Sequence, residues 1–249
     1  MPRRFEPTAL IGLIIGLSAI ALSMLLDGTK PRFLWQPSAL LIVLGGTIGA
    51  VTVKSGLSGI IAALKQVLAQ FSRKDYEEDE ATIARLAWLA RAARREGKPV
   101  LERYAQTSED PLVAKGLELT AEYSEPNLVA TCLDSLLDEE DQQGQSHIVV
   151  FESAGTYAPT FGILGAVLGL IHVLRGIDHP AELGTGIATA FVATIYGVGI
   201  ANLFFFPLAA RLRDLHQLRI RRREKLAAAL VALSDNESPL AITRRFIAS

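Results

Sequence analysis

The sequence lacks the side chains on which disulfide-bonded, metal-binding and nucleotide-hydrolysing proteins depend. Its single cysteine, Cys132, excludes a disulfide within the chain. The four histidines show no ligand spacing with that cysteine, so we expect no metal site. The chain has no G-x-x-x-x-G-K-[ST] motif, the phosphate-binding loop of many ATPases, so we do not expect ATP to be its energy source. Because no nucleophile, base and orienting group can be assembled, we expect no enzymatic activity and no cofactor.

Charge is also absent from four long stretches. The runs without Asp, Glu, Lys or Arg cover residues 8–26, 37–53, 153–174 and 184–210. Each approaches or exceeds the ~20 residues that cross a ~30 Å hydrocarbon layer as a helix. We therefore predict an all-α integral membrane protein with four transmembrane helices. The second run is the shortest and ends at Lys54, whose side chain can reach back to the interface.

The first run has an alternative interpretation as a signal peptide, because Arg3 and Arg4 precede it. However, its 19 residues exceed the usual ~7–15 of a signal peptide, and "SMLLDG" offers no small-residue cleavage site. We therefore predict a retained first span.

Two short connections indicate the orientation of the spans. "DGTKPRFLWQ" and "RGIDHPAEL" are too short to be domains, so residues 54–152 and the C-terminal tail share one side. That side carries most of the Lys and Arg, including the cluster at 211–225, and by the positive-inside rule it is the cytoplasm. We expect an inner-membrane protein with both termini cytoplasmic. Its predicted regions are spans one and two with a short periplasmic loop (1–53), a cytoplasmic helical domain (54–152), spans three and four (153–212) and a cytoplasmic tail (213–249).

The cytoplasmic domain is predicted to be a small bundle of helices. The stretch 57–71 has helical apolar spacing and would continue the second span as an amphipathic helix. The stretch 76–97 begins with acids and ends with arginines before Gly97, as a helix dipole favours. Further helices are expected at 110–123, at 125–140 with Ser124 as N-cap, and from 213 to about 233 before a break at "SDNESP". The segment 54–147 holds 17 acidic and 11 basic residues, so we expect no nucleic-acid binding.

Small residues recur every three or four positions in the third and fourth spans. They are Gly155, Ala158, Gly162, Gly165 or Ala166, and Gly169 in the third, and Gly186, Ala190, Ala193 or Thr194, Gly197 and Ala201 in the fourth. Such faces let helix backbones approach closely in lipid. They predict either a simple packing seam or a smooth contact with a moving partner.

The third and fourth predicted spans contain hydroxyl side chains and prolines, but no carboxylate. Thr160, Thr194 and Tyr196 are among the polar residues that could lie beside an ion. Because proton pathways through membranes use ionisable side chains, a partner would have to supply the acid. Pro159 and Pro207 each deprive a carbonyl four residues earlier of its helical donor. They are either fixed kinks or a matched pair of hinges beside a wet pathway.

Four stretches of the sequence carry a family resemblance: "PSALLIVLGGTIGA" (37–50), "RREGKPVLE" (94–102), "YAPTFGILGAVLGLIHVL" (157–174) and "GIATAFVATIYGVGIANLFFFPLAARL" (186–212). Together they closely resemble the A subunit of the bacterial flagellar stator, MotA or its sodium-driven relative PomA. The resemblance implies that five copies surround two copies of a MotB-like subunit, whose transmembrane aspartate supplies the missing carboxylate.

The resemblance also implies roles for individual residues. Pro159 and Pro207 match the prolines that couple ion flow to movement, and Thr194 matches the threonine facing the ion path. Ala166 stands where sodium-driven members carry threonine, which favours protons over sodium as the coupling ion. Arg94 and Glu102 match the charged pair that engages the rotor switch protein FliG, although Pro99 between them departs from the family pattern.

The predicted function is therefore a proton-conducting stator subunit that converts proton flow into torque on the flagellar rotor. In the hypothetical mechanism, small-residue faces point inward at the partner helices and the prolines act as hinges. Two alternatives remain. One is the related ExbB and TolQ group, whose members usually have three spans with the large cytoplasmic segment after the first. The other is a structural scaffold of packed helices without ion flow.

Overall fold

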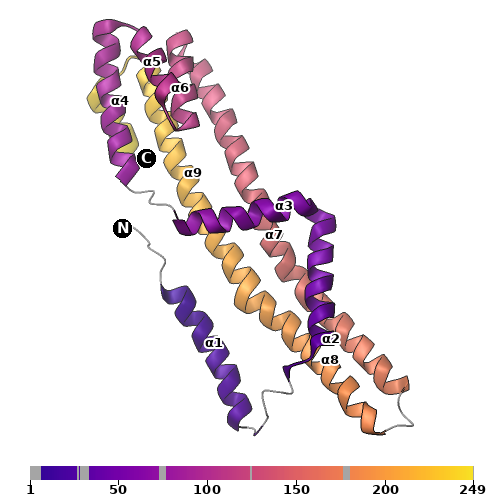
Figure 1. Cartoon of the computed structure of the whole chain (residues 1–249). Coiled ribbons are helices and arrows are strands. Elements are labelled where there is room, and N and C mark those ends of the chain that lie inside the picture. Colours follow the sequence, from indigo (N-terminus) through magenta and orange to yellow (C-terminus); the bar gives the residue numbers. More distant parts are fainter. Residues whose placement is uncertain are drawn as a thin grey trace. The chain divides into compact units, whose positions relative to one another are not determined.

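The computed structural model describes residues 7–26, 28, 34–72, 77–123, 125–175 and 180–248, and every regular element in these ranges is helical (Figure 1). The α-helices are α1 (Pro7–Leu26), α2 (Pro37–Leu40), α3 (Gly46–Ser72), α4 (Glu77–Glu96), α5 (Pro99–Thr107), α6 (Pro111–Glu122), α7 (Pro126–Arg175), α8 (Pro180–Ile200), α9 (Phe206–Ser234) and α10 (Pro239–Ala248). Two π-helical turns, Leu41–Gly45 and Ala201–Phe205, join α2 to α3 and α8 to α9. The predicted all-α fold is confirmed.

Proline positions account for many of the helix starts. Seven helices begin at a proline, namely α1, α2, α5, α6, α7, α8 and α10. Proline suits a first helical position because its fixed φ is already helical and its missing N–H would have no partner there. Among the described prolines, Pro159 and Pro207 alone stand inside a continuing run of helix. These two prolines are the candidate kinks or hinges predicted from the sequence.

The chain divides into two compact units. We call residues 1–71 and 146–213 the span unit, and residues 72–145 and 214–249 the polar unit. By length and composition, three helical stretches among the described residues could cross a membrane: Pro37–Leu68, Pro126–Arg175 and Leu183–Ser234. They contain the second, third and fourth predicted runs, while α1 occupies the first run.

Two expectations about helix continuity are wrong. The stretch 57–71 is helical, but it does not continue the second span directly, because Gly56 has φ 68° and ψ 162° and breaks α3. A positive φ is easily adopted only by glycine, and Figure 1 shows α3 changing direction along its length. In addition, the stretch 125–140 is no separate short helix, because α7 runs unbroken from Pro126 through the third span. Ser124, its predicted N-cap, lies outside the described residues.

Other helix predictions are confirmed. α4 covers the 76–97 prediction within the described residues, and Gly97 ends it with φ 84°. α6 follows the expected 110–123 stretch and is capped by Asp110, whose carboxylate accepts a hydrogen bond from the backbone N–H of Leu112 at 2.9 Å. The tail helix α9 ends at Ser234, and a turn leads to α10.

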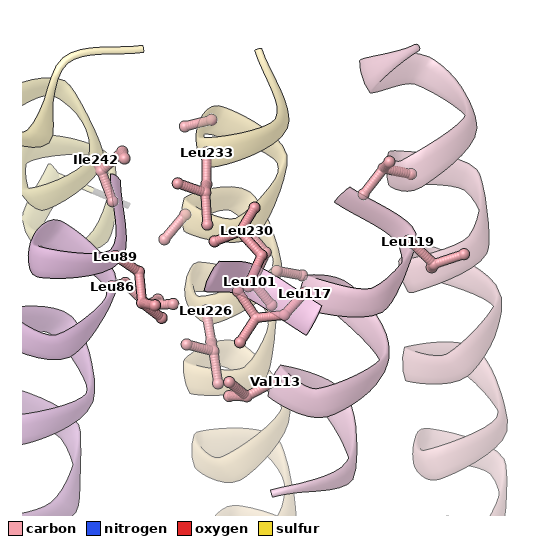
Figure 2. Close-up of a cluster of buried hydrophobic side chains, with 14 of the residues drawn as sticks. Leu86, Leu89, Leu101, Val113, Leu117, Leu119, Leu226, Leu230, Leu233 and Ile242 are labelled. Atoms are coloured by element: carbon pink, nitrogen blue, oxygen red, sulfur yellow. The ribbon is translucent and has the colours of Figure 1, made fainter. Parts of the chain in front are cut away.

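The polar unit has a hydrophobic core of its own. Figure 2 shows leucines of α4, α5, α6 and α9 pointing into one space, among them Leu86, Leu101, Leu117 and Leu230. Each of these four is at most 2 % exposed. Leu230 lies so close to Gly116 that a Cβ there would be 2.6 Å from its Cδ1. Close packing of this kind fixes the positions of α6 and α9 within the unit.

A half-buried arginine links the polar segments around this core. The guanidinium of Arg223 on α9 donates to both carboxylate oxygens of Asp110, at 2.7 and 2.6 Å, and to Glu140 on α7 at 2.9 Å. Arg219 adds an ion pair to Glu140 at 3.0 Å. One side chain thus joins the N-cap of α6 to α7 and α9.

Candidate functional site

The third and fourth predicted spans pack backbone against backbone. A Cβ added to Gly197 of α8 would lie 2.6 Å from the carbonyl oxygen of Ala158 and 3.1 Å from the Cα of Gly162 on α7. A Cβ added to Gly162 would in turn lie 2.9 Å from the carbonyl oxygen of Ala193. No side chain larger than hydrogen fits at either glycine unless the helices move apart.

The same contact extends along both helices. A Cβ at Gly169 would meet the backbone N of Ala190 at 2.7 Å and the carbonyl oxygen of Gly186 at 2.8 Å. The prediction that two small-residue faces let the backbones approach is confirmed. These faces are used inside one chain, however, so the expectation that they point inward at a partner is wrong for the glycines of this seam.

Pro159 and Thr194 lie beside this seam. A Cβ at Gly197 would lie 3.1 Å from the Cα of Pro159, and a Cβ at Gly162 would lie 3.3 Å from the Cα of Thr194. The Thr194 side chain is exposed, and its hydroxyl donates to the carbonyl of Ala190 at 3.4 Å. Its oxygen lone pairs therefore remain open to a group outside the chain. Ala166, on α7, is half-buried and offers no side-chain oxygen.

The segment before Pro207 departs from α-helical geometry. Residues Ala201–Phe205 form a π-helical turn, in which the wider hydrogen-bond spacing accommodates the donor that Pro207 lacks. Phe206, beside that proline, lies against Gly155 of α7, where a Cβ would be 2.7 Å from its Cε1. Since Gly155 is the residue four before Pro159, this contact joins the regions of both prolines.

The second predicted span supplies further contacts that sequence reasoning missed. The ring of Phe161 covers Gly46 so closely that it leaves no room for a Cβ there. The hydroxyl of Tyr196 donates to the carbonyl of Leu34 and accepts from the backbone N–H of Gln36 at 3.4 Å. Thr47 is 1 % exposed, and its hydroxyl has no hydrogen-bond partner among the described residues. The glycine pair before Thr47 was the available clue to close packing here.

Charged residues follow the apolar runs within the span unit. Lys54 donates to the hydroxyl of Ser153 at 2.8 Å, which ties the end of the second run to the start of the third. Glu152 forms an ion pair with Arg213 of α9. The carboxylate of Glu152, directly before the third run, is thus already paired within the chain.

Arg94 and Glu102 stand on different helices of the polar unit. α4 ends at Glu96 and α5 begins at Pro99, so the family's charged pair is separated by the Gly97 turn. The Arg94 guanidinium donates to the carbonyl of Asn236, in the turn between α9 and α10. Glu102 is exposed. Arg94 therefore has a structural partner that its sequence position did not indicate.

Comparison with known proteins decides the family. A family model described as "Motility protein A N-terminal" matches residues 10–97, and that of the "MotA/TolQ/ExbB proton channel family" matches residues 104–225. Motility protein A of Bacillus subtilis (strain 168) is 30% identical over 97% of this chain and 90% of its own length. The chain belongs to the motility protein A family. The resemblance read from the four motifs is confirmed.

Relatives in this family include both named types. Chemotaxis protein PomA of Vibrio alginolyticus is 30% identical over 94% of this chain and 90% of its own length. The flagellar MotAB stator complex from Bacillus subtilis contains a chain with TM-score 0.81 and 29% identity, over 97% of this chain and 95% of that one. A chain of C. jejuni MotAB has the same TM-score at 21% identity and supports the fold. The motility protein A fold thus extends over nearly the whole chain.

Proposed function

We propose that this chain is the channel-forming subunit of a flagellar stator, and that it couples proton entry to torque on the rotor. Membership of the motility protein A family and of the wider proton channel family supports the function. The observation that carries it is the α7–α8 seam, which fixes Pro159 beside Gly197 and leaves the Thr194 hydroxyl open.

The proposed topology has four spans in the bacterial inner membrane, with α1 as the first and both termini in the cytoplasm. The regions 54–152 and 213–249 would then be cytoplasmic, and the loops between spans one and two and between three and four would be periplasmic. The basic cluster at 211–225 supports this orientation, because Lys and Arg are enriched on the cytoplasmic side.

The proposed assembly is a ring of five copies around two MotB-like subunits. The solved relatives are MotAB complexes, which supports such a partner. The runs 153–174 and 184–210 of this chain contain no Asp or Glu, so the titrating carboxylate would be an aspartate of the partner's transmembrane helix. Burial raises the pKa of such a group, and a nearby hydroxyl such as that of Thr194 favours its charged form.

Protons are the proposed coupling ion, because Ala166 provides no oxygen ligand where sodium-driven members have threonine. Each proton that crosses ~100 mV releases about 2.3 kcal/mol. In our proposal this energy changes the helix geometry at Pro159 and Pro207, and the polar unit then pushes the rotor switch protein FliG through Arg94 and Glu102.

The experiment that tests this function is complementation with a proton-leak assay. The chain is expressed with a MotB-like subunit in a strain lacking its own stator. We expect swimming that a protonophore stops and that sodium removal does not affect. A partner whose plug segment is deleted should produce a proton leak, and replacing Thr194 with valine should reduce it. A scaffold without ion flow would give no partner-dependent leak.

The ExbB and TolQ alternative is less well supported. The family model that matches residues 10–97 is that of motility protein A, and these residues include nearly all of the first two predicted spans and α4. Restoration of swimming would distinguish the stator from an energiser of outer-membrane transport.

A further inference from the structure

We propose that the exposed face of α4 centred on Trp88 is a docking surface for an acidic protein surface, and that in the assembled motor this surface belongs to the rotor. The inference rests on the proposed function and extends it, because it adds a contact surface beyond Arg94 and Glu102. We call Arg85, Trp88, Arg91, Arg95 and Tyr104 the Trp88 face.

Trp88 is exposed although α4 already has a complete buried side. Leu86 and Leu89 of the same helix are 1 % and 0 % exposed and form part of the core of the polar unit. Trp88 is 49 % exposed. A large indole that the core does not need is therefore presented at the surface. Tryptophan is among the residue types that contribute most to binding energy in protein interfaces.

The indole is also held in place before any partner arrives. Its ring centroid lies 6.0 Å from that of Tyr104 on α5, with the planes tilted by 51°. Tyr104 itself packs against the core cluster. The guanidinium carbon of Arg85 lies 5.9 Å from the centre of the Tyr104 ring, within range of a cation–π interaction. Ordering of this kind reduces the entropy lost when a partner binds.

The charge around Trp88 has one sign. Between Ala81 and Arg95 the helix carries four arginines and no acidic residue. Arg85, Arg91 and Arg95 stand three before, three after and seven after Trp88, so they share its face, and all three are exposed. The region 54–147 has an excess of acids overall, so this basic stripe is a local feature. Acidic residues flank this stripe on both sides: the helix begins with the four acids of residues 77–80, and Glu96, after Arg95, forms an ion pair with Arg103 at 3.6 Å.

A protein partner fits this face better than a membrane surface does. A helix that lies in a membrane interface buries a broad apolar side. The apolar side of α4 is already used in the core, and among the side chains of α4 that the structure describes Trp88 is the one large apolar residue beside the exposed arginines. Aromatic and arginine side chains that meet an acidic surface can combine hot-spot burial with charge complementarity, which also raises the association rate.

The test measures binding of purified rotor switch protein to the detergent-solubilised stator, with the full chain assembled with its MotB-like subunit. The variants are Trp88→Ala, Trp88→Phe and Arg91→Glu. Leu240→Ala, at a residue 71 % exposed on α10, and Arg221→Glu, at an exposed residue of α9, are matched controls in the same unit. Each variant is also assayed for proton leak with the plug-deleted partner.

We expect Trp88→Ala and Arg91→Glu to weaken binding about tenfold, the size of a 1.4 kcal/mol hot spot. Trp88→Phe should weaken it less, and the controls should bind like the wild type. Added salt should weaken wild-type binding more than that of Arg91→Glu. Leak should be unchanged in every variant, because the Trp88 face is outside the spans.

Three results would overturn the proposal. The first is wild-type affinity for the rotor protein in Trp88→Ala, and the second is no measurable binding of the rotor protein by the wild type. The third is that Trp88→Ala and Arg91→Glu lose binding to phosphatidylglycerol vesicles and keep their binding to the rotor protein. The last result would assign the face to the membrane surface. Absence of a partner-dependent leak in the wild type would instead contradict the proposed function, so the two failures can be told apart.

Discussion

The ring of Phe206 lies directly against the backbone of Gly155, where a Cβ would be 2.7 Å from the ring carbon Cε1. Gly155 is four residues before Pro159, and Phe206 immediately precedes Pro207. The two prolines that interrupt helical hydrogen bonding are therefore connected through one van der Waals contact between α7 and α9. A change of helix geometry at one proline would reach the other through it.

This contact gives the first prediction. Gly155→Ala places a methyl group too close to the Phe206 ring, 2.7 Å from its Cε1. We therefore expect reduced motor torque and a lower melting temperature of the purified stator. The double variant with Phe206→Leu opens space for the methyl group and should restore part of both. Normal swimming by Gly155→Ala would show that the contact has no role in coupling.

The α7–α8 seam gives a prediction with a matched control. In Gly197→Ala the new methyl group would meet backbone atoms of Ala158 and Gly162, which cannot rotate away, whereas nothing lies within 4 Å of a Cβ at Gly199. We expect Gly197→Ala to cost about 1–3 kcal/mol, as overpacking usually does. Gly199→Ala should be neutral or slightly stabilising. Thermal unfolding in detergent compares the two, and equal melting temperatures would contradict the close packing.

The interior prolines should differ in effect from those that start helices. We expect Pro159→Leu and Pro207→Leu to abolish swimming while the stator still assembles, because each restores a regular helical hydrogen bond where a hinge is needed. Pro126→Ala, at the first residue of α7, should leave swimming intact. Membrane levels of the complex are measured in parallel. Full motility of Pro159→Leu with normal assembly would count against the hinge.

Substitutions of Arg94 and of Glu102 should differ in their effect on the melting temperature. Arg94→Gln removes the donor to the Asn236 carbonyl, so the turn before α10 should become more accessible to protease and the polar unit should melt earlier. A hydrogen bond from a charged donor contributes about 1.5–3 kcal/mol. Glu102→Gln should affect rotor binding without changing the melting temperature. If both variants melt like the wild type, Arg94 acts at the rotor alone.

Arg223 should be sensitive even to a conservative change. Arg223→Lys keeps the positive charge but loses the planar guanidinium that donates to both oxygens of Asp110 and to Glu140 from separate nitrogens. We expect a loss of about 1–3 kcal/mol in the free energy of unfolding. Arg221→Lys, at an exposed position of α9, is the control. A melting temperature equal in both variants would mean that the network is not stabilising.

The sequence predicted the elements better than their junctions. Charge-free runs and small-residue spacing were enough to predict three helical stretches that are long and apolar enough to cross a membrane, and the α7–α8 seam. Gly56 was not recognised as a break, because an isolated glycine is compatible with a helix until tertiary contacts select its positive φ. The continuity of α7 over Pro126–Arg175 was missed because polar residues and Gly144 interrupt its apolar pattern.

The site was predicted in part for a similar reason. Pro159 and Thr194 are brought to one seam, as their place in the small-residue pattern suggested. The contacts of Arg94 with Asn236 and of Tyr196 with Leu34 join residues more than 140 positions apart in sequence. A pattern within one segment cannot predict contacts between residues so far apart in the sequence. The inward orientation was wrong for the glycines of the α7–α8 seam, because a pattern shows that a face will pack closely and does not show against which neighbour.

The central claim is that the membrane-spanning part of this chain lacks the titrating group and that a partner subunit provides it. Proton flux into liposomes under an imposed potential tests this most directly, with the purified chain alone and with the plug-deleted MotB-like subunit. The account predicts flux with the partner, none without it, and none when the partner's transmembrane aspartate is replaced by asparagine. Proton current carried by the chain alone would contradict it.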